Sequence, residues 1–242
     1  MTVLPSMPPE QTASWLGILD LYERLAEGWT LIGGQMVHLH CAEREHFPVR
    51  PTNDVDAVID VRADPKILHA FTKTLVDLGF SASDESLEGR QHRWRRGAAS
   101  IDVLLPEGIG KRARRRTGVT GRPSLPTEGG TQALRRSETV AVTVEGRDGF
   151  VRRPNLVGAL VVKAAAHGNP SDPARRRHRQ DFVVLAGLLR AEDFEAEGLN
   201  ATDRRRLRAI VQTIEGDQEL LLEIPDAQVA ISRLKMAARL DG

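Results

Sequence analysis

Patterns typical of β-strands end at about residue 152, and this division constrains the fold more than any other feature of the sequence. Alternating or short apolar segments predict strands at residues 29–32, 54–61, 80–83, 91–96, 99–105, 138–144 and 149–152. Helical spacing predicts helices at residues 11–27, from about residue 35, and at 64–78, 155–167, 172–190, 202–214 and 226–239. We therefore expect an α+β fold, with a mixed β-sheet and flanking helices in residues 1–152 and a helical bundle domain in residues 153–242.

The composition favours a cytoplasmic protein with an aliphatic core. Hydrophobic residues make up 40% of the 242 residues, whereas aromatic residues make up only 4%. No apolar run approaches the roughly 18 residues of a membrane span, and the N-terminal segment lacks the pattern of a signal peptide. Cys41 is the single cysteine, so no internal disulfide can form, as is typical of a reducing compartment, and we expect it to be buried.

Basic residues are clustered although the net charge is only +1. The clusters are Lys111–Arg116, Arg175–Arg179 and Arg204–Arg206. Such clusters attract phosphate backbones, but each is equally well explained as a solvated surface. The first cluster lies in residues 106–132, which are rich in Gly, Pro and Arg and are predicted to form a long loop. Residues 1–10 are also predicted to be irregular.

Asp54-Val55-Asp56 places two carboxylates on one face of a predicted strand, because side chains at i and i+2 point the same way. Without a cation the two charges would repel each other, whereas Mg²⁺ prefers hard oxygen ligands of this kind. The alternative is an acidic strand end that faces solvent. Asp102 lies in a mostly apolar strand segment, so it needs a partner, and it can join the pair if its strand lies beside residues 54–60. The alternative for Asp102 is a strand-end residue bound to water or to a lysine.

Gly33-Gly34 separates a predicted strand from a predicted helix, about twenty residues before the acidic strand. A turn of this kind lets the backbone approach a phosphate closely and directs helix N–H groups at it, although an ordinary turn explains a single Gly pair as well. Lys163 is embedded in an apolar helix, so it must find an anion or extend to the surface. His38 and His40 are two residues apart on a helix and therefore diverge, which argues against a zinc site.

The order Gly33-Gly34, Asp54-Val55-Asp56 and Asp102 resembles the signature of the DNA polymerase β-like nucleotidyltransferase superfamily. Residues 50–56, Arg-Pro-Thr-Asn-Asp-Val-Asp, are similar to the Arg-x-Thr-x-Asp-x-Asp element of AbiEii-type nucleotidyltransferases, which include the MenT group of toxins. Lys163 and Asp181 resemble the helical Lys and the later Lys-Asp-x-x-Asp-Leu segment of that family. The sequence departs from this segment at Gln180 and Val184.

The resemblance implies a nucleotidyltransferase fold and assigns roles to nine residues. Asp54, Asp56 and Asp102 would hold magnesium, and Asp102 could instead act as the base. Gly33 and Gly34 would line the triphosphate of a nucleoside triphosphate (NTP). Lys163 and Asp181 would bind the nucleotide in a cleft closed by the helical domain; the alternative for Asp181 is a surface ion pair with an arginine. Arg50 and Thr52 would contact phosphate or shape their loop.

Three functions remain open from the sequence. The first is a magnesium-dependent nucleotidyltransferase that modifies RNA, by resemblance a tRNA 3′ end, and acts as a toxin neutralised by an antitoxin protein. The second is transfer to a small molecule, as in aminoglycoside-modifying relatives; the basic clusters argue against it. The third is an inactive protein that binds nucleotide or a partner, and the presence of all three acids argues against that.

Overall fold

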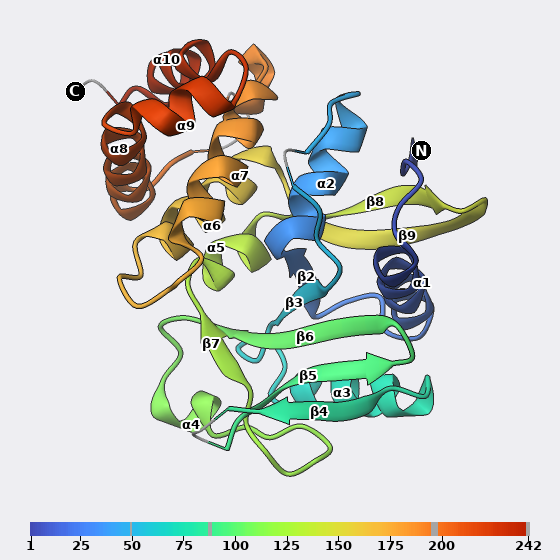
Figure 1. Cartoon of the computed structure of the whole chain (residues 1–242). Helices are drawn as coiled ribbons and strands as arrows, with labels where there is room; N and C mark the ends of the chain where they lie inside the picture. The colour runs from blue at the N-terminus through green and yellow to red at the C-terminus, as the bar shows by residue number, and fades with distance from the viewer. Residues whose placement is uncertain (49, 87–88, 195–197, 241–242) are drawn as a thin grey trace. The chain divides into compact units, whose positions relative to one another are not determined.

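The computed structural model describes residues 1–48, 50–86, 89–194 and 198–240 (Figure 1). The chain divides into two compact units. The first unit comprises Met1–Met36 and Pro51–Pro154, and the second comprises Val37–Arg50 and Asn155–Gly242. Strands belong to the first unit and the helices after residue 154 to the second, so the predicted α+β class is confirmed. The domain limits 1–152 and 153–242 stay a prediction.

A mixed six-stranded sheet is the centre of the first unit. Its order is β2-β3-β6-β5-β4, and β7 pairs with β6 outside this path. Only β3–β6 and β6–β7 are parallel pairs. The strands are β2 (Trp29–Ile32), β3 (Val55–Ile59), β4 (Ser81–Glu85), β5 (Gln91–Arg96), β6 (Ala99–Pro106) and β7 (Leu125–Thr127).

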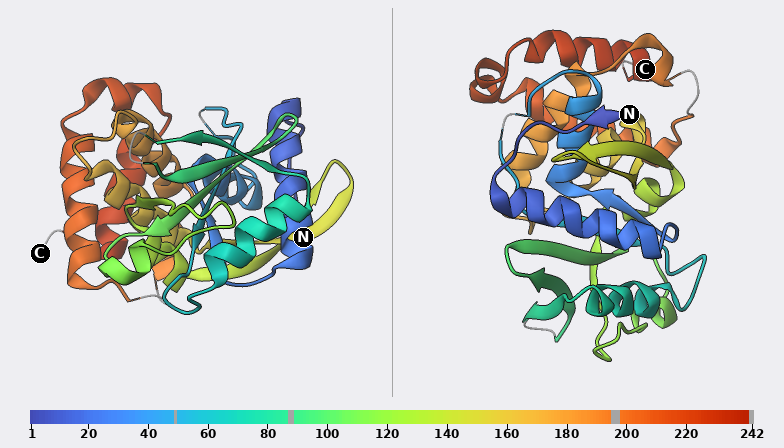
Figure 2. Two further views of the ribbon diagram at one scale, coloured as in Figure 1. Left: turned by 90° about the horizontal axis from the view of Figure 1, so that it is seen from below. Right: turned by 90° about the vertical axis from the view of Figure 1, so that its right-hand side faces the viewer.

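Two helices, α1 (Pro9–Arg24) and α3 (Ile67–Asp77), cover one face of this sheet (Figure 2). The buried ring of Trp29 in β2 packs against Tyr22 of α1 and Phe71 of α3, with ring centroids 6.2 and 5.9 Å apart. Because side chains alternate along a strand, residues in register with Trp29 face these helices, and their neighbours face the opposite side of the sheet. This alternation decides where the acidic side chains lie.

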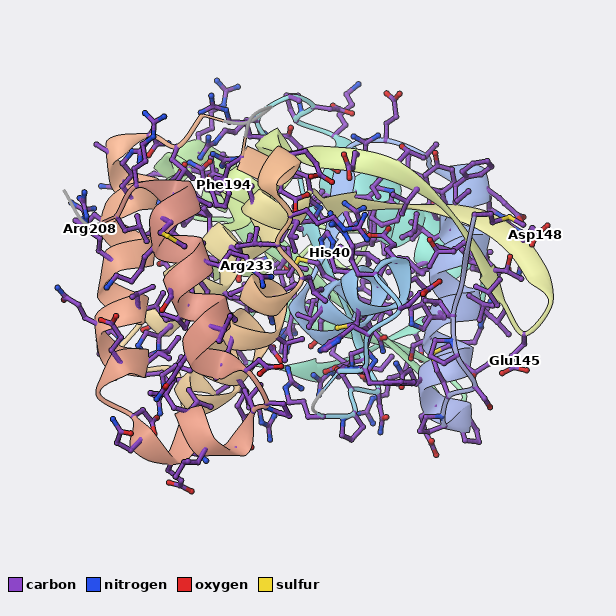
Figure 3. The ribbon with its side chains drawn as sticks, turned by 90° about the horizontal axis from the view of Figure 1, so that it is seen from above. His40, Glu145, Asp148, Phe194, Arg208 and Arg233 are labelled. Carbon is purple, nitrogen blue, oxygen red and sulfur yellow. The ribbon has the colours of Figure 1, made fainter. Side chains whose placement is uncertain are left out.

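A smaller sheet with the order β1-β8-β9 completes the first unit. It contains β1 (Thr2–Val3), β8 (Ser137–Val144) and β9 (Arg147–Pro154). The hairpin predicted around Glu145–Asp148 is confirmed: Glu145 and Gly146 form a two-residue turn in which both φ angles are positive, and Figure 3 shows Glu145 and Asp148 at its tip. Positive φ at both turn residues matches the twist of the two strands.

The long loop predicted for residues 106–132 is wrong in part. The structure forms α4 (Lys111–Arg114) and β7 within this segment, and α5 (Gly130–Arg135) begins in it. These elements are too short for a periodic pattern to reveal, and tertiary contacts form them instead: a Cβ atom at Gly130 would lie 2.9 Å from the Cα atom of Pro106 in β6. Strand β1 was also missed in a segment predicted to be irregular, because it consists of two residues that pair in parallel with β8.

The second unit is built of helices around α6 (Leu156–His167). This helix is apolar on all sides and almost wholly buried, as expected of a central helix. The others are α7 (Arg175–Gly187), the 3-10 turn η1 (Ala191–Phe194), α8 (Ala201–Glu215), the unpredicted short α9 (Gln218–Glu223) and α10 (Ala227–Ala238). Helix α2 (Gly33–Glu43) contributes residues to both units. Within the described ranges, no helix has the length and apolar character needed to cross a membrane.

Candidate active site

Asp56 and Asp102 lie directly beside each other at the centre of the larger sheet. Strands β3 and β6 are parallel, and Asp56 is the register partner of Asp102. The condition under which Asp102 can join Asp54 and Asp56, that its strand lies beside residues 54–60, is therefore met. The row continues on both sides, to Ile32 in β2 and Arg93 in β5. Residues at one level of adjacent strands share a face, so Asp56, Asp102 and Arg93 project on the same side of the sheet.

This row faces away from α1 and α3. Trp29, which contacts both helices, is in register with Ile59, so Ile59 and Ala57 face the helices and Asp56 faces the other way. Val55, Ala57 and Ile59 are fully buried, whereas Asp56 is partly exposed. The alternation in Asp-Val-Asp thus places apolar side chains in the core and leaves the carboxylates accessible to a ligand.

Gly33 brings the start of α2 against Asp56. Gly33 has φ +72°, and a Cβ atom there would overlap Oδ2 of Asp56. A Cβ atom at Gly34 would lie 2.6 Å from Oγ1 of Thr52. Only glycine permits this close approach, because it tolerates positive φ and has no side chain. Helix α2 begins at Gly33, two residues before the predicted start, so the N-terminus of the helix lies beside the acidic row.

Asp54 lies just before β3, in a segment held by buried polar residues. Oγ1 of Thr52 donates a hydrogen bond to Oδ1 of Asp54 at 3.2 Å. Gln35 donates from Nε2 to the carbonyl oxygen of Thr52 at 2.9 Å, and Ser14 donates to the carbonyl oxygen of Asn53 at 2.7 Å. Gln35 and Ser14 are buried, so they fix the backbone that carries Asp54. Neither was predicted, since isolated polar residues in helices give no sequence signal.

Arg93 is a third residue of the site that sequence reasoning missed. Its Nε and Nη2 donate to the two carboxylate oxygens of Asp102 at 2.8 and 2.6 Å, and Nη2 lies 3.5 Å from Oδ2 of Asp54. Asp102 is 6% exposed, so its carboxylate is largely removed from solvent in this ion pair. The sequence contains a usable signal: a two-residue turn at Gly97-Ala98 between the strands sets Arg93 opposite Asp102.

The acidic residues fit a divalent cation in their chemistry. Asp54, Asp56 and Asp102 carry three negative charges, of which Arg93 balances one. Carboxylate oxygens are the ligands that Mg²⁺ prefers. Within the described part of the chain, no three His, Cys, Asp or Glu side chains are gathered closely enough to enclose a metal ion. Both carboxylate oxygens of Asp102 instead accept hydrogen bonds from Arg93.

The second unit contains the other predicted polar residues in one buried network. Lys163 is 2% exposed, and its Nζ donates to Oδ2 of Asp181 at 2.7 Å. Arg50 binds the same carboxylate through Nε and Nη2 at 3.1 and 2.8 Å. Lys163 therefore does not extend to the surface, and Asp181, also 2% exposed, is not a surface residue. Burial raises the pKa of Asp181, but the charges of Lys163 and Arg50 outweigh it and hold the pKa below its ordinary value.

The remaining candidates in this unit have structural roles. Nε2 of His38 donates to the carbonyl oxygen of Arg50 at 2.8 Å, and burial lowers the pKa of His38. His40 is buried, with Nδ1 3.4 Å from Glu43. Cys41 is buried as predicted, and burial raises the pKa of its thiol to about 12. Gln180 donates to Glu223 at 2.6 Å, and Val184 is in the core.

Solved structures with a similar fold exist, although no protein-family model and no curated protein sequence matches the chain significantly. The crystal structure of an antigenic nucleotidyltransferase-like protein from Paracoccidioides brasiliensis matches with a TM-score of 0.53. The match covers 90% of this chain and 94% of that chain, at 14% sequence identity. The solution structure of the antibiotic-resistance factor ANT(2'')-Ia covers 88% of this chain and 99% of its own, at 16% identity and a TM-score of 0.45.

The similarity to the fungal protein shows that this chain has a nucleotidyltransferase-like fold. At 14% identity it establishes the fold and nothing further. The predicted fold is thus confirmed, whereas the AbiEii-type assignment and the predicted roles of the site residues stay predictions.

Proposed function

We propose that this chain is a magnesium-dependent nucleotidyltransferase that moves a nucleotide from an NTP to an acceptor hydroxyl and releases pyrophosphate. The observation that carries the proposal is the position of Asp56: it lies in register with Asp102 on one side and against Gly33, at the start of α2, on the other. Acidic residues that can hold a metal therefore lie beside a helix N-terminus that can bind phosphate.

Each residue of the first unit has a proposed task. Asp54, Asp56 and Asp102 would hold Mg²⁺, which when bound offsets phosphate charge and orients the reacting oxygens. The N–H groups at Gly33 and Gly34, together with the helix dipole, favour a negatively charged phosphate. Thr52 keeps Asp54 oriented through its hydroxyl. Alternatively, Asp102 would act as the base that accepts the proton of the acceptor hydroxyl instead of holding Mg²⁺.

Lys163, Asp181 and Arg50 are also proposed to bind the nucleotide. Lys163 and Arg50 share the single carboxylate of Asp181, so the three groups together have one more positive charge than negative, which favours a phosphate. Asp181 keeps Lys163 and Arg50 in fixed positions through three hydrogen bonds. This part of the proposal rests on the resemblance of these residues to the AbiEii-type pattern.

The proposed acceptor is RNA, by resemblance the 3′ end of a tRNA. The side chains of Lys111, Arg112, Arg114 and Arg115 are all exposed, in and just after α4 of the first unit. Exposed basic side chains bind a phosphate backbone and release its counterions. A small-molecule acceptor would have no need of such a segment. Transfer to a small molecule is one outcome of the test below.

The test measures transfer of label from each of the four NTPs, in the presence of Mg²⁺, to total RNA and to a set of aminoglycosides. Label on RNA supports the proposal. Label on small molecules alone would show that the acceptor is a small molecule and not RNA. Asp56→Asn is expected to abolish transfer and leave the thermal unfolding midpoint within a few degrees. Asp148→Asn is the matched control, because Asp148 lies at the exposed tip of the β8–β9 hairpin. Full activity of Asp56→Asn would remove the metal-site assignment.

A toxin role extends the same proposal. A protein that modifies cellular tRNA should slow growth when it is expressed alone, in the cytoplasm, and an antitoxin partner should restore growth. We expect growth inhibition from the unaltered chain and none from the Asp56→Asn variant. Equal growth of both strains would refute the toxin role while leaving the enzymatic proposal to the labelling assay.

A further inference from the structure

We propose that Arg93 competes with the divalent cation for the carboxylates of the candidate metal site. The inference rests on the proposed function, because it concerns the metal that Asp54, Asp56 and Asp102 would hold. Arg93 would act as a positioning residue. It would neutralise part of the carboxylate charge when no metal is bound, and its ion pair with Asp102 would break when metal binds. The loaded and metal-free sites would then differ in the position of one side chain.

The geometry of the ion pair supports direct competition. Arg93 makes two parallel hydrogen bonds to Asp102 at 2.8 and 2.6 Å, so it uses both carboxylate oxygens. The same guanidinium nitrogen that binds Oδ2 of Asp102 lies 3.5 Å from Oδ2 of Asp54. Arg93 therefore interacts with two of the three proposed ligands at once. A metal ion that binds Asp102 must share or displace these hydrogen bonds.

Charge adds to this effect. A guanidinium group is protonated at all physiological pH values, so Arg93 carries its charge whether or not metal is bound. A cation this close to two ligand carboxylates repels Mg²⁺, and solvent screens this repulsion less at Asp102, which is 6% exposed, than at the more exposed Asp54. Metal affinity should therefore be lower than three carboxylates alone would provide.

The structure also offers a place for the displaced side chain. A surface cavity of about 300 Å³ opens beside Asp54, and Arg93 and Arg95 contribute to its wall. Glu10, Asn53 and Gly97–Ser100 line the rest of it. Rotation of the Arg93 side chain toward this cavity would release Asp102.

The experiment titrates Mn²⁺ into the full-length protein and measures free Mn²⁺ by electron paramagnetic resonance, a readout that needs no catalysis. Arg93→Gln is expected to bind Mn²⁺ about tenfold or more tightly than the unaltered protein, since it removes both the charge and the competing hydrogen bonds. Arg93→Lys keeps the charge but cannot form the two-point contact, so its affinity should fall between the two.

Arg95→Gln is the matched control. Arg95 lies on the same strand and lines the same cavity, but it is in register with Ser100 instead of Asp102. It should change Mn²⁺ affinity by about twofold or less, because its side chain is exposed and its charge is screened by solvent. Equal affinities of Arg93→Gln and Arg95→Gln would overturn the competition. Weaker binding by Arg93→Gln would also overturn it and would make Arg93 a support that holds Asp102 as a ligand.

Asp56→Asn separates this inference from the proposed function. If the unaltered protein binds Mn²⁺ and Asp56→Asn does not, the metal site stands whatever Arg93 does. If Asp56→Asn binds Mn²⁺ as well as the unaltered protein, the metal site fails and the competition fails with it.

A second measurement is made on the unaltered protein, and a variant serves only for assignment. The Nε–H proton of Arg93, assigned by its absence in the spectrum of Arg93→Lys, should be protected from solvent exchange by Asp102 in metal-free protein. Added Mg²⁺ should remove this protection. A signal that stays protected at saturating Mg²⁺ would show that Arg93 and the metal do not compete.

Discussion

Replacement of Lys163 by Met should destabilise the second unit by about 2–3 kcal/mol. Removing one partner of a buried ion pair typically costs about 3–5 kcal/mol, because the other charge stays buried without compensation. Here Asp181 keeps its two hydrogen bonds to Arg50, so the cost should fall at or below the lower end of that range. Met occupies a similar volume, so little of the loss arises from a cavity.

The assay is urea unfolding followed by two signals. Trp15, Trp29 and Trp94 are the three tryptophans of the chain and all lie in the first unit, so fluorescence follows that unit alone. Far-ultraviolet circular dichroism follows the helices of both units. Lys163→Met should shift the circular dichroism transition to lower urea concentration.

Lys235→Met supplies the control in the same unit. Lys235 binds Glu215 at 2.9 Å, but side-chain exposures of 29% and 46% make this a surface pair, so the effect should stay within about 0.5 kcal/mol. The double variant Lys163→Met with Asp181→Asn should lose less than the sum of the two single variants, since no uncompensated carboxylate remains. A Lys163→Met variant as stable as Lys235→Met would refute the buried ion pair.

Three further predictions concern the two units. Gly33→Ala should abolish nucleotide transfer and destabilise the first unit by about 1–3 kcal/mol, because a Cβ atom would strain a positive φ and overlap Asp56; normal activity would contradict the close approach. Burial, the largest cause, lowers the pKa of His38 and His178 in the folded protein, so the unfolded chain takes up more protons below about pH 6.5. The contribution of these histidines to the stability of the second unit should therefore be full above that pH, and it should be lost as the pH falls from about 6.5 to the pKa of the folded protein. His178→Gln should reduce this loss of stability. A urea midpoint that does not change with pH would refute the prediction. Replacing Lys111, Arg112, Arg114 and Arg115 with Gln should weaken RNA binding and flatten its salt dependence without lowering stability by more than about 0.5 kcal/mol; an unchanged salt slope in filter binding would exclude this segment as the RNA contact.

Local sequence patterns were sufficient to predict the surroundings of residues that depend mainly on their neighbours along the chain. Alternation in Asp54-Val55-Asp56 places Val55 in the core and both acids on the other side, and the apolar surroundings of Lys163 require an anionic partner. The turn at Gly97-Ala98 fixes the register that sets Arg93 opposite Asp102, so this ion pair too was contained in the sequence, although it was not recognised.

Only the tertiary structure decided which distant segments meet. The parallel pairing of β3 with β6 brings Asp56 beside Asp102, which follows 46 positions later, and the start of α2 places Gly33 against Asp56. Arg50 reaches Asp181 because residues 37–50 belong to the second unit, which no local pattern indicates. The physical reason is that these contacts depend on how apolar faces are buried together, a property of the whole chain, whereas periodicity reports only on a residue and its near neighbours.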